Sequence, residues 1–187
     1  MQHIQWNDLQ ARASEAFARD GYLVVRGLYS GQPCSDLRTR TLSYLDPLLG
    51  PAEFEADLGY PGAPAGHDKP GGGTPRRLLY AYSRSELFRD WATGTQVGDY
   101  LRMLFGRDDV YMSQCHHNCV MTKHPGHSST TMWHQDIRYW SFDRPELISV
   151  WLALGRETER NGALQIIPGS HKMDIDRGRL DSALFLR

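Results

Sequence analysis

The feature that most constrains the fold is a change in sequence pattern near Gly106. Before this point, apolar residues recur at helical spacing over 7–21, 30–47 and 87–105. After it, short runs rich in β-branched and aromatic residues alternate with turn signals, over 110–123, 129–139, 147–154 and 163–167. Helices followed by strands predict a mainly β fold, a sandwich or jelly roll, preceded by N-terminal helices.

Local signals place the ends of the first elements. Asn7 or Asp8 is a suitable cap for the first helix, and Gly21 is suited to end it. The β-forming run 22–26 then predicts a short strand. Pro33 is typical of the first turn of a helix and opens the second one.

Two later stretches predict irregular or turning backbone. The segment 50–75 is rich in proline and contains the run 71–73 of three glycines, which indicates a long loop. Such a loop is either a lid over a cavity or a surface linker, and the sequence does not decide between them. Asn161 followed by Gly162 is the strongest hairpin signal in the chain.

Composition narrows the class of protein. The 187 residues are enough for one domain, and 21 basic residues against 22 acidic ones leave no basic stripe for nucleic acid. No apolar run is long enough to span a bilayer, and the N-terminus lacks the pattern of a secretory signal. The three cysteines form no even disulfide framework, so we expect reduced thiols in a cytoplasmic protein. The sequence gives no indication of the oligomeric state.

The strongest chemical signal is the triplet His134-Gln135-Asp136. On an extended strand, side chains two residues apart leave the same face, so His134 and Asp136 can point into one cavity. An imidazole and a carboxylate are two-thirds of the facial triad that binds Fe(II) and leaves coordination positions open. The alternative is an ordinary strand histidine beside a carboxylate with its own partners.

A second segment makes the triplet more specific. Residues 161–172 read Asn-Gly-Ala-Leu-Gln-Ile-Ile-Pro-Gly-Ser-His-Lys, and residues 17–28 read Phe-Ala-Arg-Asp-Gly-Tyr-Leu-Val-Val-Arg-Gly-Leu. With the His-Gln-Asp triplet, the chain from about Phe17 to Lys172 resembles the phytanoyl-CoA dioxygenase family of Fe(II)- and 2-oxoglutarate-dependent oxygenases. The resemblance implies a double-stranded β-helix, a cupin-like jelly roll, with the metal between its two sheets.

The resemblance also implies a domain layout. We expect one oxygenase domain over 1–187, with a mostly helical part over 1–105 that includes the 50–75 loop, and core strands with the metal motif over 106–172.

The resemblance further implies roles for individual residues. His134 and Asp136 correspond to iron ligands and are the catalytic pair. Gln135, Trp151 and Cys119 correspond to positions that contact 2-oxoglutarate. Trp151 is equally well explained as a core aromatic residue on a buried strand. Strand alternation puts two sets on opposite faces, of which only one can face the cavity: Cys115, His117, Cys119, Met121 and Lys123 against Gln114, His116, Asn118 and Thr122. The alignment of Cys119 favours the first set.

The last part of the family pattern has no counterpart in the chain. The family takes its second iron histidine, and an arginine that binds 2-oxoglutarate, from late strands, but no histidine follows His171. We therefore expect the chain to be C-terminally incomplete, without the last strands, and both missing residues to lie beyond Arg187. His171 itself is the competing candidate for the third ligand.

The sequence thus predicts a dioxygenase that hydroxylates a small organic substrate with Fe(II) and 2-oxoglutarate in its full-length form; whether the 187 residues are active alone is left open. The alternative is a non-catalytic jelly-roll protein that binds small molecules and has lost the full metal triad. A zinc site at His116 and His117 is disfavoured, because neighbouring strand residues face opposite ways. Related halogenases have a small residue in place of the carboxylate, so Asp136 favours hydroxylation.

Overall fold

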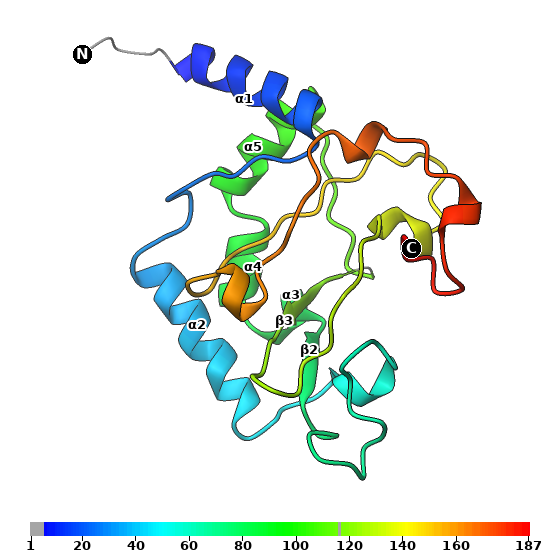
Figure 1. The fold of residues 1–187 in the computed structure, drawn as a ribbon. Helices are drawn as coiled ribbons and strands as arrows, with labels where there is room; N and C mark the ends of the chain where they lie inside the picture. Colours follow the sequence, from blue (N-terminus) through cyan, green and yellow to red (C-terminus); the bar gives the residue numbers. More distant parts are fainter. Residues whose placement is uncertain (1–5, 116) are drawn as a thin grey trace.

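The computed structural model describes residues 6–115 and 117–187, and the side chains of residues 6–9, 138 and 139 lie outside that description. The described residues form five α-helices, which are labelled in Figure 1. They are α1 (Trp6–Asp20), α2 (Gln32–Leu45), α3 (Ala81–Arg84), α4 (Glu86–Ala92) and α5 (Thr95–Phe105). The three predicted helical regions are therefore confirmed. Asn7 and Asp8 lie inside α1 rather than before it.

The ends of these helices follow from local chemistry. Helix α1 stops at Gly21, which has φ of +81° and whose amide donates to the Phe17 carbonyl. Glycine adopts this left-handed conformation without the steric cost that a Cβ brings. Pro33 lies in the first turn of α2, where its missing N–H breaks no hydrogen bond.

The described residues form one small antiparallel sheet, which lies to the right of α2 in Figure 1. Its strands are β1 (Ala52–Phe54), β2 (Pro75–Leu79) and β3 (Cys119–Met121), in the order β1-β2-β3. Leu78 of β2 pairs with Val120 of β3 and has no exposed surface. The prediction of an entirely irregular 50–75 loop is therefore wrong at its start, because β1 and the 3₁₀ turn η1 (Glu55–Asp57) fall within it.

The prediction of a mainly β fold is wrong for the described residues. Of the four strand regions predicted after Gly106, only the first contains a strand, β3, and 22–26 is not a strand either. Asn161 and Gly162 close the 3₁₀ turn η3 (Glu159–Asn161), with Gly162 in the left-handed region, instead of forming a hairpin. Alternation of apolar residues gives a chain two faces, but a strand also needs a neighbour to accept its hydrogen bonds.

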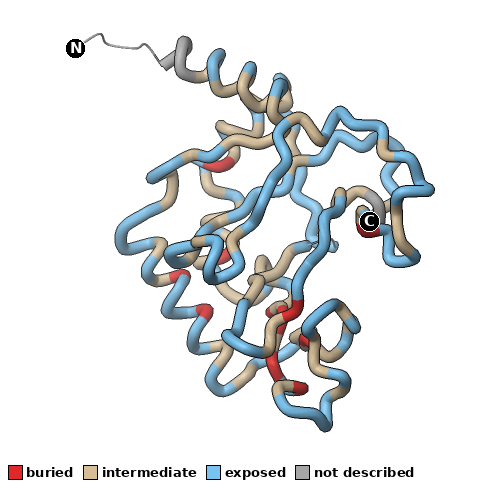
Figure 2. Tube along the Cα trace, in the orientation of Figure 1, coloured by how far each residue is buried: buried red, intermediate tan, exposed pale blue. Residues whose placement is uncertain are grey.

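The apolar core lies between the helices and the sheet. Buried apolar side chains there are Leu37, Leu78, Phe88 and Val97, and a further one, Phe185, packs against Tyr60 and His134. Helix α2 packs on α4, and α1 packs on α5. Figure 2 shows buried positions along α2 and β2, whereas the long segments that follow Asp143 are mostly exposed. None of the helices in the described part of the chain has the length and apolar character to cross a membrane.

A buried ion pair connects the sheet to the segment that precedes the His-Gln-Asp triplet. Arg76 of β2 and Glu55 of η1 are 2% and 0% exposed, with Nη1 and Oε2 3.3 Å apart. The same guanidinium donates to Ser129 Oγ and Thr131 Oγ1, each at 2.9 Å. A buried charge is tolerated only when it is paired and hydrogen-bonded, so this network fixes the path of the chain toward His134.

Candidate metal-binding site

The structure brings His134 and Asp136 together, although not on a strand. Gln135 between them is extended, with φ of −110° and ψ of 129°, and Asp136 is the first residue of the 3₁₀ turn η2 (Asp136–Tyr139). One extended residue is enough to direct its two neighbours to the same side. The result is a distance of 3.2 Å between His134 Nε2 and Asp136 Oδ1.

The hydrogen bond of Nδ1 indicates the tautomer of His134. Nδ1 lies 2.7 Å from the carbonyl oxygen of Met132, and because a carbonyl only accepts, Nδ1 is the donor. In the neutral imidazole, Nε2 then carries a lone pair and faces an oxygen of Asp136 that also carries lone pairs. A metal ion placed between the two atoms would be bound by a lone pair from each of them.

The spacing of these two atoms fits adjacent ligands of one metal ion. Ligands about 2.1 Å from a metal and at right angles to each other are about 3.0 Å apart. The 3.2 Å between His134 Nε2 and Asp136 Oδ1 is close to that value. Histidine ligands commonly donate their other ring nitrogen to a carbonyl, as His134 does to Met132. This donor pair therefore fits a divalent metal.

A third side chain, His117, contacts the same carboxylate. Its Nδ1 lies 3.5 Å from Asp136 Oδ2, the oxygen turned away from His134. Contacts from His117 first, and from His134 second, hold the pKa of Asp136 well below its usual range, although burial opposes the shift. Asp136 is therefore ionised at neutral pH, the form in which a carboxylate binds metal.

Aromatic rings pack near the imidazole of His134. The ring of buried Phe185 meets the imidazole edge to face, with centroids 5.7 Å apart, and Tyr60 contacts the same phenyl ring at 5.0 Å. The amide of Leu186 donates to the carbonyl of Trp133 at 2.9 Å. These contacts restrict the orientation of the imidazole.

A cavity of about 180 Å³ has His117, but neither His134 nor Asp136, among its lining residues. Its lining residues are Arg77, Leu79, Tyr80, Gln114, Cys115, His117, Asn118 and Cys119. Cys115, His117 and Cys119, which were predicted to share a face toward the cavity, do line it. Gln114 and Asn118, which were predicted to face the other way, line it too. Strand alternation was the wrong rule for these residues, because β3 begins only at Cys119. Burial raises the pKa of the Cys119 thiol, and the charge of Asp136 adds to this rise.

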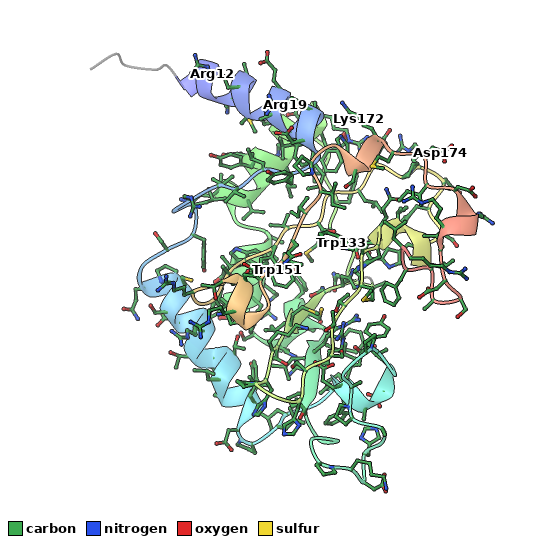
Figure 3. The ribbon with its side chains drawn as sticks, viewed as in Figure 1. Arg12, Arg19, Trp133, Trp151, Lys172 and Asp174 are labelled. Carbon is green, nitrogen blue, oxygen red and sulfur yellow. The ribbon has the colours of Figure 1, made fainter. Side chains whose placement is uncertain are left out.

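Two of the predicted cosubstrate residues have partners elsewhere. The Gln135 amide donates to the Ser170 carbonyl at 3.1 Å. The indole N–H of Trp151 donates to Glu157 at 2.8 Å, and Figure 3 shows Trp151 apart from Trp133. Trp151 is also 48% exposed, which contradicts its alternative assignment as a buried core residue. Contact of Gln135, Trp151 or Cys119 with 2-oxoglutarate stays a prediction.

His171 belongs to the end of helix α1. Its Nε2 lies 3.2 Å from the carbonyl oxygen of Ala18, and its ring lies directly against Gly21. The amide of Gly169 donates to the Asp20 carbonyl at 2.8 Å, which ties the same turn to the helix. Among the described residues, no group of three or more His, Cys, Asp or Glu side chains is placed to hold a metal ion. His171 therefore does not complete the pair, and His116, part of the zinc alternative, lies outside the described residues.

Two histidine contacts were thus not recognised from the sequence. The contact of His117 with Asp136 depends on a left-handed backbone that residue type indicates only weakly. The packing of His171 on Gly21 joins residues 150 positions apart, and the only sequence signal was the glycine itself.

Comparisons with known proteins identify the family. The family model described as Phytanoyl-CoA dioxygenase (PhyH) matches residues 17–185. The chain is 29% identical to the ectoine dioxygenase of Sphingopyxis alaskensis over 178 residues, covering 91% of this chain and 53% of the relative. It is 42% identical to phytanoyl-CoA dioxygenase 1 of Oryza sativa over 92 residues, covering 49% of this chain and 31% of the relative.

A third relative is the probable alpha-ketoglutarate-dependent hypophosphite dioxygenase of Stutzerimonas stutzeri, 30% identical over 104 residues, or 54% of this chain and 35% of the relative. No solved structure matches. The chain spans about half the length of the ectoine dioxygenases it matches over most of its residues. Because the family model matches nearly all of it, the chain belongs to the phytanoyl-CoA dioxygenase family.

Proposed function

We propose that this chain carries the iron-binding pair of a 2-oxoglutarate-dependent dioxygenase that hydroxylates a small organic substrate. The observation that carries the proposal is the convergence of His134 Nε2 and Asp136 Oδ1 at the spacing of adjacent metal ligands. When bound, Fe(II) and 2-oxoglutarate supply the oxygen chemistry, which couples decarboxylation of 2-oxoglutarate to succinate with hydroxylation of a substrate C–H bond.

The residues of the chain prepare this site before any metal binds. His134 offers Nε2 because its Nδ1 donates to the Met132 carbonyl, and Asp136 offers Oδ1 because the contact of His117 with Oδ2 favours the ionised carboxylate. The cavity that His117 lines has one cationic side chain, Arg77, which pairs with Glu53 at 3.0 Å, and two carboxamides, Gln114 and Asn118. These groups are chemically suited to a dicarboxylate such as 2-oxoglutarate.

Family membership supports the proposed substrate class and the proposed fold of the complete domain. Two of the three reported relatives are named for the organic molecules ectoine and phytanoyl-CoA, and the third is named for hypophosphite. The family has a cupin-like jelly-roll fold, and we propose a double-stranded β-helix for the complete domain.

The experiment is an anaerobic titration of the full-length enzyme with Fe(II) in the presence of 2-oxoglutarate, followed by the weak visible charge-transfer band of the chelate and by succinate release after oxygen is admitted. We expect both signals from the wild type and neither from Asp136→Ala. The matched control is His67→Ala, since His67 forms an exposed pair with Asp57, with Nε2 2.8 Å from Oδ1. Equal signals from the wild type and Asp136→Ala would refute the metal assignment.

A second function, non-catalytic binding of a small molecule, is favoured by one observation: the described residues offer only two of three protein ligands. The titration separates the two functions. A protein that retains 2-oxoglutarate in equilibrium dialysis without Fe(II), and develops no visible band with it, is the binding protein.

A further inference from the structure

The carboxylate of Asp136 is held by a different imidazole on each oxygen. Oδ1 faces His134 Nε2 at 3.2 Å, and Oδ2 faces His117 Nδ1 at 3.5 Å. His134 comes from the loop before η2, whereas His117 comes from the turn before β3. The two side chains therefore approach from separate parts of the chain and together limit rotation of the carboxyl group about χ2.

His117 reaches this position through an unfavourable backbone. Its φ is +47°, in the left-handed region, which costs a non-glycine residue about 1–2 kcal/mol. The strain persists because several contacts hold the residue. Its carbonyl accepts from the Cys119 amide at 3.0 Å, and its ring meets Trp140 edge to face with centroids 4.8 Å apart. Backbone strain of this kind persists only where surrounding contacts hold the residue, and it is concentrated at functional sites.

A carboxylate can bind a metal through one oxygen or through both. Binding through both would occupy a second coordination position, one of those that a facial triad leaves open for cosubstrate and oxygen. A donor on Oδ2 prevents this, because it engages the second oxygen and keeps the carboxylate turned with Oδ1 toward the metal. His117 is in place to be that donor.

We propose that His117 is a positioning residue that keeps Asp136 a one-oxygen ligand of the metal, an inference that rests on the proposed function. His117 is not a metal ligand itself. Its Nδ1 contacts the oxygen remote from His134, and the described residues contain no three-donor metal group. It acts on the metal only through the carboxylate.

The test is titration of the 187-residue chain with Mn(II), a redox-inert substitute for Fe(II), followed by the electron paramagnetic resonance signal of the free ion. Two variants separate the side chain from the backbone. His117→Gly accepts the left-handed conformation but has no donor, and His117→Asn tolerates that conformation and keeps an N–H group. His67→Asn, in the exposed pair with Asp57, is the control.

We expect His117→Gly to weaken Mn(II) binding by about 10–100-fold, the usual effect of losing a partner of a metal ligand. We expect His117→Asn to recover most of the affinity and His67→Asn to match the wild type. Both variants lose the ring contact with Trp140, so recovery of affinity in the asparagine variant alone assigns the effect to the donor on Asp136 and not to packing.

The outcomes distinguish this inference from the function on which it rests. A wild-type chain that binds no Mn(II) overturns both. A wild type that binds, with His117→Gly binding equally well, overturns only the role of His117. An asparagine variant that binds Mn(II) as poorly as the glycine variant also overturns only the role of His117.

Discussion

The contact between Gly21 and His171 predicts a specific loss of stability. A Cβ added to Gly21 would lie 2.3 Å from Nδ1 and 2.6 Å from Cγ of His171. Since Cγ is the base of the ring, the whole imidazole must move, and its hydrogen bond to the Ala18 carbonyl is lost. Gly21→Ala therefore combines a steric conflict with the cost of φ at +81°.

The magnitude follows from these two parts. Left-handed backbone costs a non-glycine residue about 1–2 kcal/mol, and a lost hydrogen bond costs about 1 kcal/mol net. We expect Gly21→Ala to lower the free energy of unfolding by about 2–3 kcal/mol, or Tm by about 4–12 °C for a chain of this size. Gly27→Ala is the matched control. Gly27 has φ of +74° but nothing within 4 Å of an added Cβ, so only the backbone cost of about 1–2 kcal/mol applies.

Urea unfolding followed by tryptophan fluorescence measures these differences, and a double-mutant cycle isolates the contact. His171→Ala alone should cost about 1 kcal/mol, because only the bond to Ala18 is lost. The variant with both changes should be no less stable than Gly21→Ala, since the ring that the methyl group displaces is gone. Additive single effects, or equal losses at Gly21 and Gly27, would show that the ring does not lie against the end of α1. His171→Ala should leave Mn(II) affinity unchanged, since the ring is not a ligand.

The remaining predictions concern buried charge and thiol reactivity. Arg76→Met should lower the free energy of unfolding in urea by about 3–5 kcal/mol, because Glu55 is left buried without its partner. Burial alone would raise the pKa of Glu55, but hydrogen bonds from Ser129 outweigh it and lower the pKa. Ionised Glu55 therefore stabilises the fold above about pH 4, and this stabilisation is lost as the pH falls further. Thermal unfolding of wild type and Glu55→Gln should therefore converge in acid; a gap that widens there contradicts the assignment. Thiol labelling should modify exposed Cys115 before Cys119, whose pKa is raised by burial, and the reverse order would place Cys119 outside the interior.

The parts of the fold predicted correctly are those determined by neighbouring residues. Gly21 ends α1 and Pro33 opens α2 because these residue types restrict or permit particular φ values wherever they occur. The strands were predicted poorly because pairing depends on residues far apart. β2 pairs with β3 across about 40 positions, and β1 lies in a segment whose prolines and glycines indicated a loop.

The same contrast between local and long-range determinants applies to the candidate site. The approach of His134 and Asp136 needs only one extended residue between them, so it is present although the predicted strand is absent. The contact of His117 with Asp136 needs the sheet, the turn before β3 and the ring of Trp140 to be in place together. The pair itself is therefore encoded by the triplet, whereas the geometry of its carboxylate depends on tertiary structure. It follows that variants which loosen the sheet without touching the triplet, such as Arg76→Met, should weaken metal binding through the same loss of control over Asp136 that removal of His117 produces.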